Sequence, residues 1–350
     1  MYCQPLVQDW IIRPYLSTSH HMLERSRQMK TWLDSLGYRD YTLIAASEDA
    51  SFRSYHRLQM AEQSFIVMDA PPELEPCDQF IKVARKISAA GLSAPEIIQQ
   101  NLQQGFLVLT DFGNTDYLSV LNDDTEAALY GDALSALSGM QNRIDSDDLP
   151  VYDDALLNRE MDLFHDWFLP QLLGVELTGS QMDCWLSVKQ RLVANALAQP
   201  QVFVHRDYHS RNLMKIGKQN PAILDFQDAV QGPVTYDLVS LLRDCYISWP
   251  KARVEHWLKH YFDRAVANRL VEVEYDQFRH WFNLMGVQRH LKAIGIFSRL
   301  HIRDGKPGYL KDIPRTLAYV SQVSAEEASL AELESLITEL DLSTRVDSLS

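Results

Sequence analysis

Short apolar runs separated by polar turns dominate the first third of the chain, whereas longer segments with helical spacing follow them. Five of the runs have the length and composition of β-strands: residues 41–45, 54–58, 63–68, 97–100 and 106–109. Two segments keep apolar side chains at helical spacing, residues 23–36, which stop before Gly37, and residues 78–90. The pattern predicts an antiparallel sheet with one helix before it and one helix inserted into it.

The rest of the chain is predominantly helical in pattern, with a short strand-like region inside it. Residues 157–168 place their aromatic and aliphatic side chains at core spacing, and residues 284–303 form a second long helical segment. Between them, the apolar runs 201–204, 213–216 and 221–224 predict three short strands. No internal repeat or long linker interrupts the chain, and its last ten residues, Asp341 to Ser350, are expected to form a frayed tail.

Polar groups that follow two of these strands form the most informative pattern in the chain. His205-Arg206-Asp207 and Asn212 follow the first strand as H-R-D-x-x-x-x-N, and Asp225-Phe226 follows the last one. The two blocks match the catalytic loop and the metal-binding loop of kinase-fold phosphotransferases. Asp207 is predicted to accept the proton of the attacking substrate hydroxyl. Asn212 and Asp225 are predicted to hold Mg²⁺, which prefers oxygen ligands.

A zinc site is the alternative chemistry for the same segment, because His205 and His209 lie four residues apart. Zinc protease helices, however, carry a Glu directly after the first His, and this chain has Arg206 there. The segment also follows a strand and has the pattern of a loop, so the two rings need not share a face. We therefore interpret His209 as a structural hydrogen-bonding residue.

With these blocks the chain resembles the aminoglycoside phosphotransferase and choline kinase superfamily, small-molecule kinases that share the protein-kinase fold. The segment Gly232 to Leu242 strengthens the resemblance, which implies that Asp237 braces the catalytic loop. A charge favoured by a helix N-terminus is a compatible explanation for Asp237. The resemblance implies an α+β, bilobal fold. Its small antiparallel-sheet lobe, residues 1–112, would bind nucleotide, and its larger, mainly helical lobe, residues 113–350, would carry catalysis and acceptor binding.

A narrower resemblance covers nearly the whole chain. Four segments are similar to bacterial kinases of cell-wall amino sugars: residues 51–55, 68–73, 157–164 and 288–297. This implies ATP-dependent phosphorylation of the anomeric hydroxyl of N-acetylmuramate or N-acetylglucosamine in peptidoglycan recycling. Two other functions remain open. One is a kinase of another hydroxyl acceptor, such as an aminoglycoside or an amino alcohol. The other is a non-catalytic pseudokinase that serves as a binding module.

The nucleotide side departs from the protein-kinase pattern in two respects. The expected phosphate loop contains no glycine, and the third strand ends Ile66-Val67-Met68-Asp69 without the usual nucleotide-binding Lys. Another cation must therefore offset phosphate charge. The candidate nucleotide contacts are Ser51, Phe52, Arg53, Lys82, Leu109 and Asp111. Arg53 and Lys82 are equally compatible with solvated surface positions.

Candidate acceptor contacts lie in the helical part of the chain. Arg289, Lys292, Arg299 and Arg303 fall within an arc of about 80° on one helix. Such a stripe suits an anionic group, for example a lactyl carboxylate or a sugar phosphate, but acidic neighbours or solvent could equally satisfy it. We favour Arg289 as its most important member, and we add Arg211 and Glu160. Glu160 lies off the apolar face of its helix and could bind sugar hydroxyls.

Composition limits the partners and the compartment. A formal net charge of −14 over 350 residues argues against nucleic acid as a partner, because phosphate binding needs a basic surface. Four scattered cysteines without a C-x-x-C pair suit a reducing compartment. We find neither a signal-peptide pattern nor an apolar run of about 20 residues that would span a membrane. The expectation is a cytoplasmic enzyme of a small-molecule substrate, and the sequence defines no oligomeric state.

Overall fold

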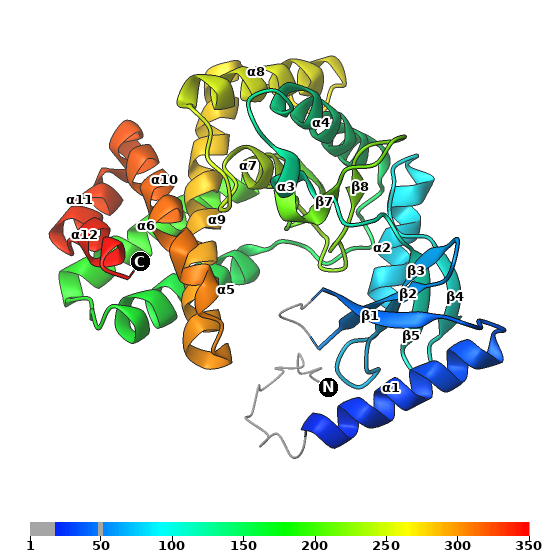
Figure 1. Cartoon of the computed structure of the whole chain (residues 1–350). Helices are drawn as coiled ribbons and strands as arrows, with labels where there is room; N and C mark the ends of the chain where they lie inside the picture. The colour runs from blue at the N-terminus through cyan, green and yellow to red at the C-terminus, as the bar shows by residue number, and fades with distance from the viewer. Residues whose placement is uncertain (1–17, 48–51, 350) are drawn as a thin grey trace, which may run out of the picture. The chain divides into compact units, whose positions relative to one another are not determined.

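The computed structural model describes residues 18–47 and 52–349 and divides the chain into two units (Figure 1). The smaller unit lies within Met1–Cys77 and Ile97–Asp111, and the larger unit within Asp78–Glu96 and Phe112–Ser350. Each unit has its own sheet and helices. The α+β class predicted from the sequence is confirmed.

The smaller unit is a five-stranded antiparallel sheet with the strand order β1-β2-β3-β5-β4. The strands are β1 (Thr42–Ser47), β2 (Ser54–Gln59), β3 (Ser64–Asp69), β4 (Ile97–Asn101) and β5 (Phe106–Thr110). Their bounds agree with the five predicted runs to within two residues. The apolar alternation of the sequence therefore located the whole sheet.

Helix α1 (Thr18–Ser35) packs against one face of this sheet and supplies half of its core. The rings of Trp32 and Phe106 stack with 5.7 Å between their centroids. The buried residues of this core come from both elements: Met29, Trp32, Leu33, Leu58, Val67, Phe106 and Val108.

The larger unit is mainly helical. Its α-helices are α2 (Asp78–Ala89), α3 (Tyr117–Val120), α4 (Glu126–Arg143), α5 (Asp154–Leu163), α6 (Gly179–Leu197), α7 (Tyr236–Leu242), α8 (Lys251–Ala267), α9 (Tyr275–Asp304), α10 (Ile313–Glu326), α11 (Ala331–Glu339) and α12 (Leu342–Asp347). The shorter or wider helical turns are η1 (Phe164–Leu172), η2 (Ser210–Asn212), η3 (Pro307–Asp312) and η4 (Ala328–Leu330). Within the described residues, no helix is both long enough and apolar enough to cross a membrane.

Two two-stranded sheets lie inside this helical unit and carry the polar loops. Strand β6 (Gln201–Val204) pairs with β9 (Val230–Pro233), and β7 (Leu213–Met214) pairs with β8 (Ala222–Ile223). All three predicted strands are present. Two of them, β7 and β8, are only two residues long and therefore shorter than expected.

Two further expectations need correction. The segment predicted as one helix to residue 168 changes at Phe164 into the wider π-type turn η1, which contains Pro170. The predicted frayed tail instead contains α12, in which Leu342 and Val346 are buried. These two apolar side chains, four residues apart, give the last helix a face to pack.

Helix α2 belongs to the larger unit rather than to the sheet unit, so the structural division differs from the predicted boundary at residue 112. Its apolar face explains the difference. The Phe80 ring lies 4.9 Å from that of Phe226, and the carbonyl oxygen of Ser93, just beyond the helix, accepts a 2.8 Å hydrogen bond from the Ile223 amide. The helix is inserted in sequence between β3 and β4 but packs beside the metal-binding loop.

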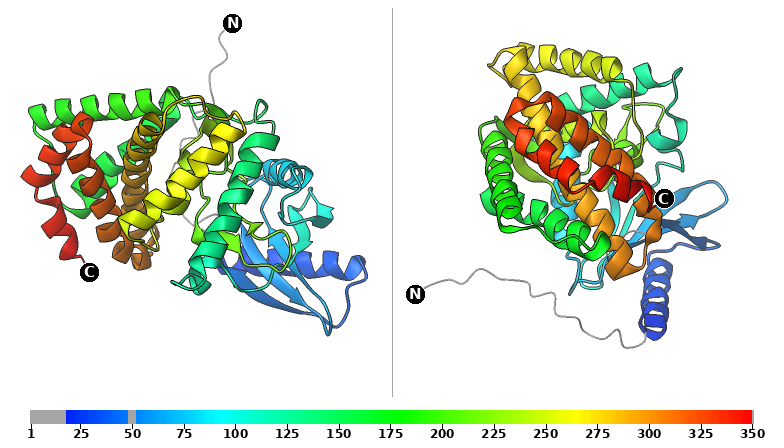
Figure 2. Two further views of the ribbon diagram at one scale, coloured as in Figure 1. Left: turned by 90° about the horizontal axis from the view of Figure 1, so that it is seen from above. Right: turned by 90° about the vertical axis from the view of Figure 1, so that its left-hand side faces the viewer.

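Helix α9 is the element that most of the larger unit packs around (Figure 2). It contacts α5, η1, α6, α7, α8, α10 and η3. Gly295 permits its closest approach, because a Cβ atom there would lie 2.6 Å from the carbonyl oxygen of Leu163, where α5 meets η1. The missing side chain thus lets α9 and α5 touch backbone to backbone.

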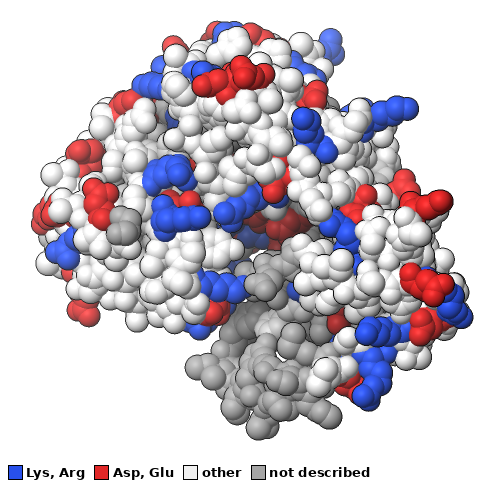
Figure 3. All heavy atoms as spheres, in the orientation of Figure 1, with Lys and Arg blue, Asp and Glu red and all other residues white. Residues whose placement is uncertain are grey.

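Charged side chains of both signs are interspersed over the face shown in Figure 3. Basic groups lie next to acidic ones rather than gathering into a broad area of one sign.

Replacing Gly295 with Ala should lower the free energy of unfolding by about 1–3 kcal/mol, the usual cost of overpacking a tight contact. The added methyl group would have to displace the backbone of Leu163, which cannot move as a side chain can. Urea denaturation followed by circular dichroism measures the change.

The matched control is Gly131→Ala in α4, where an added Cβ meets no atom within 4 Å. That substitution should stabilise the protein by up to about 1 kcal/mol, because Ala is the better helix former. Equal effects at the two glycines would show that α9 and α5 do not depend on this contact.

Candidate active site

The catalytic loop begins where β6 ends, and Asp237 holds it through two hydrogen bonds from backbone amides. One carboxylate oxygen of Asp237 accepts a 2.7 Å hydrogen bond from the His205 amide, and the other accepts a 3.0 Å bond from the Arg206 amide. Arg206 needs such support, because its φ of 79° lies in the left-handed region that residues other than glycine rarely adopt. The predicted bracing role of Asp237 is confirmed. Asp237 also lies in the first turn of α7, yet burial outweighs its two amide bonds and raises the pKa of Asp237 to about 7.

The backbone of Asp207 is held by a hydrogen bond, whereas its carboxylate oxygens have no hydrogen-bond partner among the described residues. In this part of the chain that carboxylate also forms no ion pair, while the Asp207 carbonyl oxygen accepts a 3.0 Å bond from Asn212 Nδ2. Burial by itself would raise the pKa of Asp207. The cationic groups of Lys292 and Arg289, with others nearby, outweigh this effect and hold the pKa below its ordinary value. Asp207 is therefore an ionised acceptor at neutral pH.

Asn212 and Asp225 lie side by side, next to Asp207, as the sequence predicted for a joint site. Asn212 Nδ2 lies 3.2 Å from one carboxylate oxygen of Asp225, and Gln227 Nε2 donates a 2.7 Å bond to the other. The Leu224 amide also donates a 2.9 Å bond to the Asn212 carbonyl oxygen. These contacts tie the metal-binding loop to the catalytic loop. Gln227 was not identified from the sequence, although its place two residues after Asp225 was a signal.

The oxygen atoms of this pair fit Mg²⁺ in their chemistry. Asp225 supplies one carboxylate and Asn212 one amide oxygen, and the buried amide oxygen of Gln227 beside them has no hydrogen bond. In the part of the chain that the structure describes, no group of three or more His, Cys, Asp or Glu side chains is arranged to hold a metal. One carboxylate and an amide leave coordination positions for water and phosphate, as Mg²⁺ requires.

Of the two histidines of the loop, His205 makes a structural hydrogen bond, whereas the predicted structural hydrogen bond of the His209 ring is not found among the described residues. The His205 ring nitrogen Nε2 lies 3.0 Å from the Leu224 carbonyl oxygen, and burial lowers the pKa of His205 to about 4. Burial also lowers the pKa of His209, whose ring packs edge-on against Tyr246 at 5.2 Å. Both rings are neutral at physiological pH.

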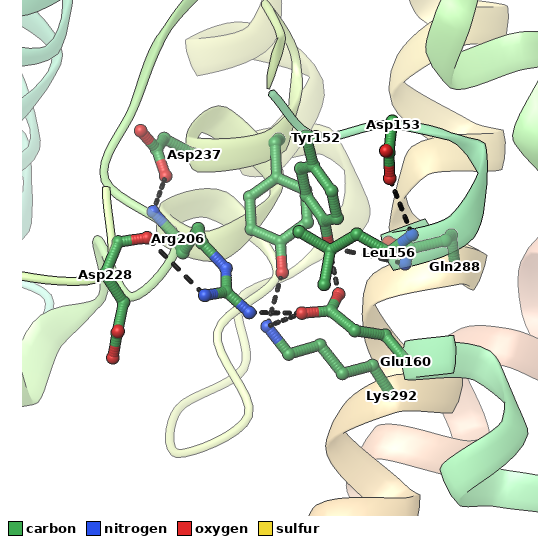
Figure 4. A network of polar contacts seen from close by, with 10 residues as sticks. Tyr152, Asp153, Leu156, Glu160, Arg206, Asp228, Asp237, Gln288 and Lys292 are labelled. Atoms are coloured by element: carbon green, nitrogen blue, oxygen red, sulfur yellow. Dashed lines mark hydrogen bonds and ion pairs between the residues drawn. The ribbon is translucent and has the colours of Figure 1, made fainter. Parts of the chain in front are cut away.

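Glu160 lies at the centre of a buried ion network (Figure 4). Its side chain points toward Arg206, Lys292 and Tyr152. One carboxylate oxygen lies 3.1 Å from the Lys292 ammonium and also accepts a bond from Arg206, and the other oxygen accepts a bond from the Tyr152 hydroxyl. Lys292 donates a further 3.0 Å bond to the Tyr236 hydroxyl. Burial would raise the pKa of Glu160, but the two cations and the hydroxyl lower it overall.

This placement differs from the predicted role of Glu160 as a ligand of sugar hydroxyls. Only 5% of the residue is exposed, and its oxygens are already bonded to Arg206, Lys292 and Tyr152. A carboxylate so engaged positions the catalytic loop rather than reaching for a substrate. Helical spacing placed Glu160 off the aromatic face but could not reveal that α9 approaches that side.

The remaining acceptor candidates lie next to the turn that follows α7. Arg289 is buried and donates to the Cys245 sulfur at 3.6 Å. Arg211 places its guanidinium 3.8 Å above the ring of Tyr246. The two candidates therefore contact adjacent residues of this turn, Cys245 and Tyr246. Their substrate-binding roles stay predictions.

Arg303 and Lys292 are paired with carboxylates, so the predicted cationic stripe is not one continuous site. Arg303 pairs with Asp304 at 2.7 Å, and Lys292 pairs with Glu160. Arg299, by contrast, resembles Arg289 in having a buried Nε without a hydrogen bond among the described residues. The helical periodicity placed these side chains on one face correctly but did not identify their partners.

Most nucleotide candidates fall in the smaller unit. Ser51 lies outside the described residues. Phe52 is partly exposed, Leu109 is buried in β5, and Arg53 forms a 2.6 Å ion pair with Glu75. Their contacts with a nucleotide stay predictions.

The other two candidates are each bonded to a partner of opposite charge. Asp111 accepts bonds of 2.6 and 3.0 Å from Arg57, a residue that the sequence analysis did not consider. Lys82, in α2, forms a 3.0 Å ion pair with Asp148 and donates a 2.6 Å bond to its carbonyl oxygen. Lys82 would have to leave Asp148 to serve as the cation that replaces the missing strand Lys, so this placement does not favour the prediction.

Comparison with known proteins agrees with this site. Residues 42–280 match the model of a family described as the phosphotransferase enzyme family. A protein of Pseudomonas putida named N-acetylmuramate/N-acetylglucosamine kinase is 46% identical over 333 residues, which cover 92% of this chain and 98% of that protein. Proteins of the same name from Neisseria meningitidis and Caulobacter vibrioides are 40% and 32% identical, covering 91% and 89% of this chain and 96% and 95% of the respective relatives.

Solved structures share the fold at low sequence identity. A choline kinase from Streptococcus pneumoniae superposes with a TM-score of 0.61 at 11% identity, covering 86% of this chain and 99% of that one. An aminoglycoside phosphotransferase with ADP bound gives a TM-score of 0.55 at 14% identity, covering 84% and 97%. The predicted protein-kinase-like fold is thereby confirmed. From the family match and the relatives at 32–46% identity, we conclude that this chain belongs to the phosphotransferase enzyme family.

Proposed function

We propose that this phosphotransferase moves the γ-phosphoryl group of ATP to the anomeric hydroxyl of N-acetylmuramate or N-acetylglucosamine. The observation that carries the proposal is the open, ionised carboxylate of Asp207 beside the oxygen pair of Asn212 and Asp225. The identity of the acceptor is inferred from the names of relatives that are 40–46% identical over nine tenths of this chain. The product would be a sugar 1-phosphate available for cell-wall recycling, and we propose a cytoplasmic location, where ATP is available.

The chemistry of the acceptor suits the base. An anomeric hydroxyl is more acidic than an ordinary alcohol, so a carboxylate with a lowered pKa can accept its proton once the hydroxyl is aligned. Asp207 would take that proton as the oxygen attacks phosphorus. Asn212 and Asp225 would hold Mg²⁺, which offsets the negative charge of the phosphates. Alignment and electrostatic stabilisation then account for most of the acceleration.

Charge near Asp207 favours this acceptor over the cationic alternatives. Arg289 is buried without an ion pair among the described residues, so a positively charged aminoglycoside or amino alcohol would meet a like charge beside it. A non-catalytic scaffold is disfavoured for another reason. It has no chemical need for a base and two metal-binding groups held together by hydrogen bonds.

Asp207→Asn should reduce kcat by at least about 10²- to 10⁴-fold, the range for loss of general-base catalysis, while nucleotide binding persists. Asp225→Asn should also abolish Mg²⁺-dependent nucleotide binding, because it removes the anionic metal ligand. Acceptor-dependent ADP release measures kcat, and calorimetry measures nucleotide affinity.

Phosphorus NMR and mass spectrometry of the product test the position of transfer. We expect a sugar 1-phosphate that forms only when Asp207 is present. A 6-phosphate would exclude the anomeric assignment. No sugar-dependent ADP release across amino sugars, amino alcohols and aminoglycosides would favour the scaffold.

Glu160→Gln should lower the free energy of unfolding by about 3–5 kcal/mol at pH 7, the usual cost of leaving buried charges without a partner. Because the folded state holds the pKa of Glu160 below its ordinary 4.5, the stabilisation is present above pH 4.5 and is lost as pH falls through the lower, folded-state pKa. The difference between wild type and variant should therefore shrink in acid. Urea denaturation across this pH range measures it.

Asp263→Asn in α8 is the matched control, since it removes a carboxylate from an exposed pair with Lys259. Its effect should stay within about 0.5 kcal/mol at every pH. If Glu160→Gln behaves like this control, the network does not hold the loop.

A further inference from the structure

Arg289 is a buried cation that no carboxylate neutralises. Only 5% of the residue is exposed, and within the described residues its Nε makes no hydrogen bond and its guanidinium forms no ion pair. Its one hydrogen-bond contact in this part of the chain is the Cys245 sulfur, 3.6 Å from Nη1. Burial raises the pKa of Cys245, so this thiol is neutral and offers only a weak acceptor. Burying an unpaired charge is costly, which makes such a residue a candidate for binding an anion.

The neighbouring carboxylates are committed to other contacts. Asp244 accepts bonds from the Ser210 amide at 2.9 Å, from the Ser210 hydroxyl and from the Tyr246 amide at 2.9 Å. Lys292, one turn from Arg289 on α9, already has Glu160. The positive charge of Arg289 thus remains available beside the catalytic loop.

The position of Arg289 indicates which reactant carries the anion. Its partner Cys245 stands between Asp244, which accepts a 2.9 Å bond from the Ser210 amide, and Tyr246, whose ring lies 5.2 Å from that of His209. Ser210 and His209 belong to the loop that carries Asp207, the predicted base for the acceptor hydroxyl. An anion bound by Arg289 would therefore belong to the acceptor rather than to the nucleotide phosphates.

Next to Arg289 is an aromatic cluster around Tyr246, whose ring also carries the Arg211 guanidinium at 3.8 Å. Tyr246, which follows Cys245, lies beside His209 at 5.2 Å and Phe297 at 6.3 Å between ring centroids. The buried Nδ1 of His209 has no hydrogen bond in the described part of the chain and can bind a hydroxyl. Apolar faces beside a polar atom are typical of small-molecule sites.

We propose that Arg289 binds the lactyl carboxylate of N-acetylmuramate and thereby sets the preference of this chain for the acidic over the neutral amino sugar. The inference rests on the proposed function and adds the residue that separates its two substrates. The lactyl ether stands two ring positions from the anomeric carbon, so an Arg near Asp207 can reach it while the anomeric hydroxyl meets the base. The planar guanidinium matches a carboxylate in a two-point contact.

The test compares wild type with Arg289→Met, which keeps an unbranched apolar stem and removes the charge. The ratio of kcat/KM for N-acetylmuramate to that for N-acetylglucosamine should fall by about 10- to 100-fold, the size expected for losing hydrogen bonds to a charged group. Most of the change should be in KM for N-acetylmuramate. The melting temperature of the ligand-free variant is measured alongside, so that a loss of folding is distinguished from a loss of binding.

The methyl ester of N-acetylmuramate separates charge recognition from shape recognition. Wild type should strongly prefer the acid to the ester, and Arg289→Met should lose that preference. The matched control is Arg279→Gln, an exposed arginine of the same helix that pairs with Asp276. This control should retain the wild-type ratio.

Several outcomes would overturn the inference. Equal losses for both sugars would mean that Arg289 acts on the phosphoryl group or on the loop. If Arg289→Met fails to fold, two other measurements decide. Arg289→Lys should keep part of the acid preference, and N-acetylmuramate should raise the melting temperature of wild type more than its methyl ester does, with ADP and Mg²⁺ present. Wild type that phosphorylates neither sugar contradicts the proposed function itself; wild type that phosphorylates both, with no effect of Arg289, contradicts only this inference.

Discussion

The buried carboxylate of Glu160 is the contact on which the catalytic loop depends. It joins α5 to Arg206 in the loop and to Lys292 in α9. Leu163 lies three residues after Glu160 in α5, and Gly295 lies three residues after Lys292 in α9. The two helices touch at this pair, where only a glycine fits. The close approach of the helices brings opposite charges together, and the charges in turn hold Arg206 in its left-handed conformation. The ion pair of Glu160 with Lys292 and the backbone contact of Leu163 with Gly295 therefore depend on each other, because both would be lost if α5 and α9 moved apart.

The same arrangement sets the charge around the base. Lys292 and Arg289 share one face of α9, yet Glu160 neutralises only Lys292. Asp207 consequently has a lowered pKa and an unneutralised cation in its surroundings. Aminoglycoside phosphotransferases and a choline kinase share this fold at 11–14% identity. A common scaffold thus leaves the choice of acceptor to a few side chains on helices such as α9, which is why the fold alone does not define the substrate.

Local patterns predicted the features that depend on sequence-local physics. Alternating apolar residues located the strands of the small sheet, and the spacing of Asp207, Asn212 and Asp225 after short strands predicted that they meet. Partners across the fold could not be read in the same way. Helical periodicity placed Arg289 and Lys292 on one face, but whether either is neutralised depends on α5, more than 100 residues away in sequence. Gln227 and Asp244 were missed because their roles follow from distances between loops rather than from spacing within one.

The contrast between Lys292 and Arg289 also separates stability from function along a single helix. Lys292 is paired with the buried carboxylate of Glu160, whereas Arg289 forms no ion pair among the described residues and is the residue that we propose for ligand binding. Selection for stability alone would remove the charge of Arg289 or supply a partner, and Asp244 is near enough to act on it yet is bonded to Ser210 and Tyr246 instead. A protein can retain such a residue when ligand binding supplies the partner that the folded chain does not. The charge on α9 is thus best explained by the ligand that completes it.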